Sequence, residues 1–167
     1  MEERLGSNHT SILHVFINFG NIYANQGRTE EAKGLYLRAL DGYEKAWGPK
    51  HASTLRTVNN LGSIYVEQGD LTRAIDMYLR ALAGYEEGLG PKHPSTLRTI
   101  SSLASLHANR GEMEDAGKMY LRALRGYQYA EGNHEAAMTM IRKQLAMIEV
   151  TNIVVDGHCE ERLFSRL

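Results

Sequence analysis

A repeat of 42 residues is the feature that most constrains the fold of this 167-residue chain. It is marked by His9, His51 and His93, and the six residues from 51 closely match the six from 93: His-Ala-Ser-Thr-Leu-Arg and His-Pro-Ser-Thr-Leu-Arg. Each unit also ends alike, with Tyr-Leu-Arg-Ala-Leu at 36–40, 78–82 and 120–124. A fixed period of this length is typical of stacked supersecondary units, each of which needs a neighbour to bury its apolar face.

Each unit is predicted to form two helices joined by a tight turn. In the second unit, apolar residues from Leu55 to Tyr65 recur at spacings of three and four, which indicates one amphipathic helix, here called helix A. Gly69 is expected to end helix A in the left-handed conformation, and Asp70 to cap the following helix B. Helix B then continues to the Gly/Pro segment 88–91, so the unit is a helical hairpin.

The small and aromatic residues of the hairpin follow a known pattern. Leu61-Gly62-x-x-Tyr65 is followed by Ala74-x-x-x-Tyr78-x-x-Ala81, and the other two units carry variants of it. The pattern resembles the tetratricopeptide repeat (TPR). The 42-residue length is similar to the repeats of kinesin light chains, and the near-identity of the units resembles the C-terminal arrays of fungal and bacterial NOD-like receptor ATPases. The resemblance covers about residues 1 to 148 and implies an all-α, right-handed α-solenoid of helix-turn-helix hairpins.

The repeat also predicts the organisation of the chain. Residues 1–8 align with the end of a preceding helix B, so the chain is expected to open inside a longer array. The remaining parts are three repeats, a partial fourth repeat, and a degenerate cap or an unrelated tail: 9–50, 51–92, 93–133, 134–148 and 149–167.

Composition excludes several classes of protein. The net charge of −1 and the absence of a Lys/Arg run argue against nucleic-acid binding, and no apolar run is long enough for a membrane span. One cysteine cannot form an internal disulfide, and no apolar signal segment follows the acidic N-terminus. We therefore expect a cytoplasmic protein.

Catalytic, metal and cofactor sites are not predicted. No nucleophile is paired with a base, and no glycine-rich phosphate loop follows a strand. The periodic histidines lie one repeat apart, too far to share a metal ion, and are expected to start helices. His107 is expected in a hydrogen-bonded packing role, and Tyr36, Tyr78 and Tyr120 in the core.

Polar residues of helix A that lie off the packing stripe form the candidate binding site. In TPR arrays these positions line the concave face, and Asn59 matches the groove asparagine of kinesin light chains, which bind acidic cargo peptides. Asn and Ser can bond an extended peptide, and Arg can bind carboxylates. The residues predict a protein-interaction module for a protein or acidic peptide, with a merely solvated face as the alternative: His14, Asn21, Asn25, Arg56, Asn59, Ser63, Arg98, Ser101, Ser105, Asn109 and Arg142.

The first helix A has an apolar face that its counterparts lack. Three of its residues stand where the second unit has Thr54, Thr57 and Asn59: Ile12, Val15 and Ile17. Such a face predicts burial by another chain, either a second copy or a longer host, or by Met1 to Leu5 folding back. The alternative function is therefore a homo-oligomeric scaffold, or the sensor segment of a larger NOD-like receptor.

Overall fold

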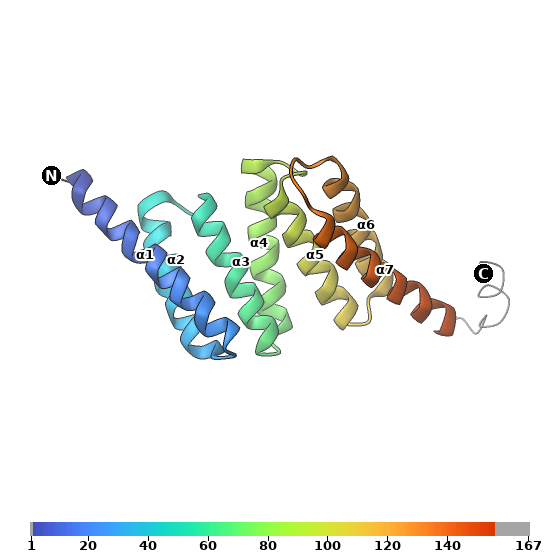
Figure 1. The fold of residues 1–167 in the computed structure, drawn as a ribbon. Coiled ribbons are helices and arrows are strands. Elements are labelled where there is room, and N and C mark those ends of the chain that lie inside the picture. The colour runs from blue at the N-terminus through green and yellow to red at the C-terminus, as the bar shows by residue number, and fades with distance from the viewer. Residues whose placement is uncertain (1, 156–167) are drawn as a thin grey trace. The chain divides into compact units, whose positions relative to one another are not determined.

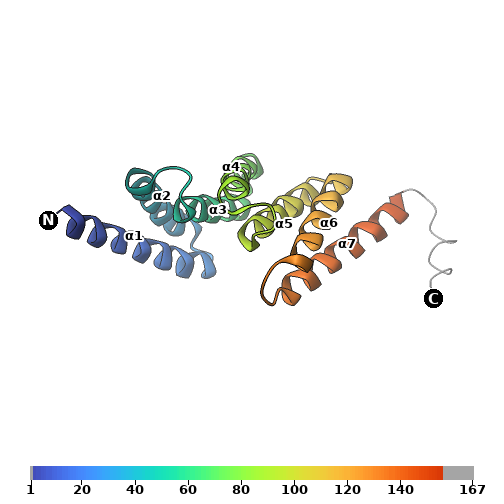
Figure 2. The same ribbon diagram turned by 90° about the horizontal axis from the view of Figure 1, so that it is seen from above.

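The computed structural model describes residues 2–155, with the side chains of residues 10–149, and this part forms seven α-helices and no strand (Figures 1 and 2). The chain divides into two compact units, Met1–Pro91 and Lys92–Leu167. The first unit contains α1 (Glu2–Asn25), α2 (Thr29–Trp47), α3 (Ala52–Glu67) and α4 (Leu71–Leu89). The second contains α5 (Pro94–Asn109), α6 (Met113–Tyr129) and α7 (Glu135–Val155). The all-α prediction is confirmed.

Consecutive helices pair as the repeat predicts. α1 packs on α2, α3 on α4 and α5 on α6, while α2 also packs on α3 and α6 on α7. The turn inside the second hairpin has the expected chemistry: Gly69 adopts a φ of 75°, and the carboxylate of Asp70 accepts the Arg73 N–H at 3.0 Å. Positive φ at this point suits glycine, because a Cβ would clash with the backbone.

Two of the periodic histidines start helices, as predicted. The imidazole Nδ1 of His51 accepts the N–H of Ser53 at 3.2 Å, and that of His93 accepts the N–H of Ser95 at 3.1 Å. Each histidine thereby satisfies one of the unpaired donors at a helix N-terminus.

The first histidine differs, because His9 lies inside α1. The repeat predicts a turn near residues 6–9, but the helix runs unbroken from Glu2 to Asn25. The corresponding turns contain Pro49 and Pro91, whereas this position holds Ser7, which does not interrupt a helix. At the other end α7 follows the expected fourth helix A and continues to Val155. The rest of the expected cap or tail, residues 156–167, lies outside the described residues.

Each hairpin is closed by a large side chain lying against a small residue of the partner helix. A Cβ added to Gly84 of α4 would stand 2.5 Å from a methyl carbon of Leu55, and one added to Gly62 of α3 would stand 2.8 Å from the Tyr78 ring. The same reciprocal contacts occur between Leu13 and Gly42 and between Tyr36 and Gly20. In the third hairpin Leu97 meets Gly126, while alanine replaces the other glycine. The core prediction for Tyr36, Tyr78 and Tyr120 is confirmed by their burial.

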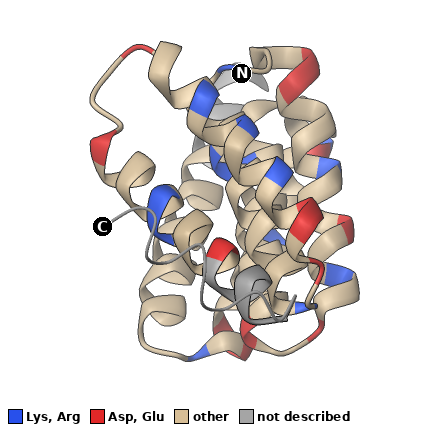
Figure 3. Cartoon of the chain, turned by 90° about the vertical axis from the view of Figure 1, so that its right-hand side faces the viewer, with Lys and Arg blue, Asp and Glu red and all other residues tan. Residues whose placement is uncertain are grey.

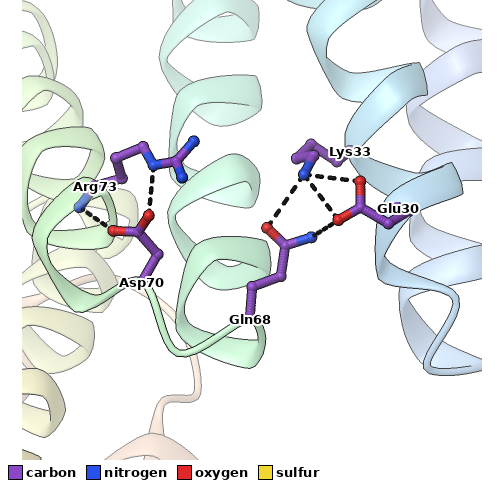
Figure 4. A network of polar contacts seen from close by, with 5 residues as sticks. All are labelled: Glu30, Lys33, Gln68, Asp70 and Arg73. Atoms are coloured by element: carbon purple, nitrogen blue, oxygen red, sulfur yellow. Dashed lines mark hydrogen bonds and ion pairs between the residues drawn. The ribbon is translucent and has the colours of Figure 1, made fainter.

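Polar bonds join the first hairpin to the second. The Gln68 side chain at the end of α3 donates to Glu30 at 2.6 Å and accepts from Lys33 at 3.3 Å (Figure 4). The next helix adds a further bond, because Arg80 of α4 donates to Glu44 of α2. A buried apolar cluster also lies in this part of the chain, with Leu40 of α2 packed against it: Leu55, Val58, Ala81 and Tyr85. Apolar contact and edge bonds therefore hold the two hairpins together.

Acidic and basic residues are interspersed along the described helices (Figure 3). Many ion pairs among the described side chains are exposed and join near neighbours in the sequence, such as Lys45 with Asp41 and Lys118 with Glu114. Pairs of this kind contribute little to stability. In the described part of the chain, no helix combines the length and apolarity that crossing a bilayer requires.

The glycine contacts generate the first prediction. We expect Gly42→Ala to lower the free energy of unfolding by about 1–3 kcal/mol, because the new methyl group overlaps Leu13. Gly34→Ala, in the same helix with nothing within 4 Å, should raise it by about 0.5–1 kcal/mol through helix propensity. Urea unfolding followed by circular dichroism measures both. Equal effects of the two substitutions would contradict the packing role.

Candidate functional site

Most residues of the candidate binding site are accessible at the surface. In the first unit His14, Asn21, Asn25, Arg56 and Ser63 are exposed. In the second unit Arg98, Asn109 and Arg142 are exposed, and Ser105 is half-buried. Each unit thus presents a polar row along its helices A.

Three predicted site residues are buried, and their assignment is corrected here. Asn59 and Ser101, expected in the binding site, are each 6% exposed, and Ile17, expected on the assembly face, is 4% exposed. They occupy the same repeat position, four residues after the leucine that packs against glycine in the hairpin. Residues four apart share one face of a helix, so this position faces the partner helix. Ser101 instead donates its hydroxyl hydrogen to the backbone oxygen of Leu97 at 3.0 Å.

Three other site residues each hold a core tyrosine. The hydroxyl of Tyr36 donates to Asn21 at 2.6 Å. The hydroxyls of Tyr78 and Ser63 lie 2.9 Å apart, and those of Tyr120 and Ser105 lie 2.7 Å apart. The row of helix A side chains therefore has a structural function, because it pairs phenol groups whose rings are buried.

Two arginines of the site have no acidic partner among the described side chains. Arg142 is paired with Glu135 at 3.0 Å, whereas no carboxylate within residues 10–149 pairs with Arg56 or Arg98. An unpaired guanidinium at the surface offers up to five donors to a ligand carboxylate.

An aromatic cluster lies beside Arg56 in the first unit. Tyr43 stacks on Trp47 with ring centres 5.2 Å apart, and His14 meets the Tyr43 ring edge-on at 5.6 Å. His51 extends the cluster, with its ring 4.4 Å from that of Trp47. Burial raises the pKa of Tyr43, and the nearby charge of Arg56 acts in the opposite direction. The ring of Tyr43 thus contacts His14, and Arg56 lies near enough to affect its phenol.

Trp47 belongs to this site, although it was not among the predicted site residues. Its side chain is 39% exposed and in contact with Tyr43, His14 and His51. The available signal was its departure from the repeat, because the equivalent residue of the next repeat is Leu89.

His107 bonds Glu112 at 2.5 Å and is partly buried, which agrees with a hydrogen-bonded packing role. No group of three or more potential metal ligands was found among the described residues.

The sequence matches the family model for the tetratricopeptide repeat over residues 10–87 and again over 54–128. The chain belongs to the tetratricopeptide repeat family. TPR repeats are in general a protein-interaction fold. None of the curated proteins compared matches the chain.

Solved structures show the same TPR fold. BtubC (BKLC) from P. vanneervenii has a TM-score of 0.75 at 21% identity, over 81% of this chain and 54% of its own. A Podosopora anserina protein, described as a kinesin light chain with nearly identical TPR-like repeats, has a TM-score of 0.75 at 20% identity, covering 89% of this chain and 70% of that one. Thus the chain spans about half the length of BtubC. The resemblance to kinesin light chain-like repeats is confirmed at the level of the fold.

A chaperone has a related arrangement of helices. SycD from Yersinia enterocolitica, in complex with a peptide of the translocator YopD, has a TM-score of 0.65 at 15% identity. The match covers 85% of this chain and 95% of SycD.

The buried Tyr36 is expected to make the stability of the fold depend on pH. Burial, and secondarily the charge of Glu67, raise the pKa of Tyr36 to about 12, against 10.0 for a free phenol. The folded state therefore holds this proton more tightly, so its stabilising effect is complete below pH 10 and is lost as the pH rises towards 12.

We expect the free energy of unfolding to fall between pH 10 and 12, and Tyr36→Phe to make that fall shallower. Urea unfolding at several alkaline pH values measures the slope. An unchanged slope in the variant would contradict the assignment to Tyr36.

Proposed function

We propose that this chain is a non-catalytic interaction module that binds an acidic peptide or protein segment on its helix A face, expected to be concave. The binding centre lies in the first unit, at Arg56 and the adjoining aromatic cluster of His14, Tyr43, Trp47 and His51. TPR neighbours support a protein partner, since SycD is solved with a peptide. We also propose a cytoplasmic location, which the single cysteine favours.

One observation carries the proposal. Arg56 is exposed, has no carboxylate partner within the described side chains, and lies beside the phenol of Tyr43. Arginine binds carboxylates through paired N–H bonds, and exposed aromatic rings add contact area at little conformational cost. This surface therefore suits a ligand that carries acidic side chains next to aromatic or apolar ones.

The flanking residues suit the backbone of such a ligand. Asn25 is exposed at the end of α1, and Ser63 is exposed on α3. Their side chains can donate to peptide carbonyls and accept from peptide N–H groups. In the second unit, Arg98 and Asn109 offer the same chemistry on α5.

A second candidate function is a self-associating scaffold, or the sensor segment of a larger NOD-like receptor. It is favoured by the exposed apolar residues Ile12 and Val15 on α1. In that case the helix A residues would be solvated, and association would depend on α1.

Trp47 provides a direct test of peptide binding, because it is the only tryptophan in the chain. We expect a Glu-rich peptide to change its fluorescence saturably, and the matching Gln-rich peptide to leave it unchanged. Arg56→Ala should weaken binding by about 10- to 100-fold, because a charge-assisted bond is lost. Added salt should weaken it as well.

The matched control is Arg73→Ala, which removes one arginine from the start of α4. Arg73 is exposed and already paired with Asp70, so its loss should change peptide affinity by less than about twofold. Equal binding of the two peptides, or equal effects of the two substitutions, would refute the proposed site.

A further inference from the structure

The side of α1 that faces away from α2 carries four large apolar residues in the open. Ile12, Val15, Phe19 and Ile22 are each between 47% and 50% exposed. They are spaced by three, four and three residues, so they form one stripe along the helix. Four such side chains on one face are more than the scattered apolar residues of an ordinary surface.

The repeat shows how such a stripe is normally used. The residues 42 positions later lie on α3, which packs against α2, and each is at most 1% exposed: Thr54, Thr57, Leu61 and Ile64. In α3 this face therefore forms the stacking surface between two hairpins. In α1 the same face is uncovered by the residues that the structure describes.

The composition of α1 favours an apolar partner. From Thr10 to Asn25 the helix contains no Asp, Glu, Lys or Arg. The core of a protein interface is depleted in charge, and a three-four spacing of apolar residues is typical of paired helices. Two copies of this segment can approach without repulsion between charged side chains.

The hydrogen bonds between stacked hairpins indicate which partner covers the apolar stripe of α1. In α3, the Thr54 hydroxyl donates to the backbone oxygen of Gly48 at 2.8 Å, so it binds the end of the preceding hairpin. Ile12 holds this position in α1 and has no donor. A further hairpin placed there would lose this bond and would also meet Ile12 and Phe19, which are bulkier than Thr54 and Leu61 at the equivalent positions.

We propose that α1 pairs with α1 of a second copy of this chain, so that the two stripes face each other across a twofold axis. The arrangement is isologous, because the same stripe of each copy forms the interface. The association is complete at two copies. This inference rests on the scaffold alternative, and its failure would leave peptide binding at Arg56 untouched.

The test is light scattering with size separation over a concentration series. We expect the wild-type chain to reach twice the monomer mass, and Ile12→Thr/Val15→Thr to raise the dimer dissociation constant roughly 100-fold. The double variant should fold, since α3 carries threonine at both equivalent positions. Circular dichroism before the run verifies its helix content.

Leu37→Thr is the matched control. Leu37 is 45% exposed on α2, outside the stripe, so its replacement should leave the dimer unchanged. A monomer at every concentration would overturn the proposal. So would a dimer that survives the double variant, or a mass that keeps rising with concentration, since the last indicates head-to-tail stacking.

Discussion

The close approach of two helices at a glycine is the contact on which the rest of the structure depends. In each hairpin a leucine of helix A lies against a glycine of helix B, as Leu55 does against Gly84. A tyrosine of helix B returns the contact, as Tyr78 does against Gly62. These two points determine the rotation of each helix about its axis. That rotation decides which side chains face the next hairpin and which face solvent.

Burial of the tyrosine ring connects packing to the candidate binding site. The ring fills the space beside the glycine, and its hydroxyl then needs a partner, which helix A supplies from Asn21, Ser63 or Ser105. These three side chains are therefore partly committed to the fold. The groups available for a ligand are Arg56 and Arg98, which have no carboxylate partner among the described side chains, and the aromatic cluster around Trp47.

Much of the fold could be predicted because the turn glycines and the helix-packing residues recur in each repeat. The glycine turn, the Asp70 cap and the buried tyrosines follow from residue types at fixed positions. The binding face was predicted less well. Asn59 is polar yet lies on the buried side, since its register and not its polarity places it there. Trp47 was missed because rings from three elements converge on it only in space.

The sequence by itself determined the hairpin and its period, because helix propensity, turn chemistry and apolar spacing act over a few residues and recur every 42. Tertiary structure decided which polar residues reach solvent and which arginines have no carboxylate partner among the described side chains. It also decided that the stripe from Ile12 to Ile22 is uncovered while its counterpart on α3 is buried. The reason is physical: burial and pairing depend on the neighbouring helix, and the repeat pattern of one unit does not state what lies beside it.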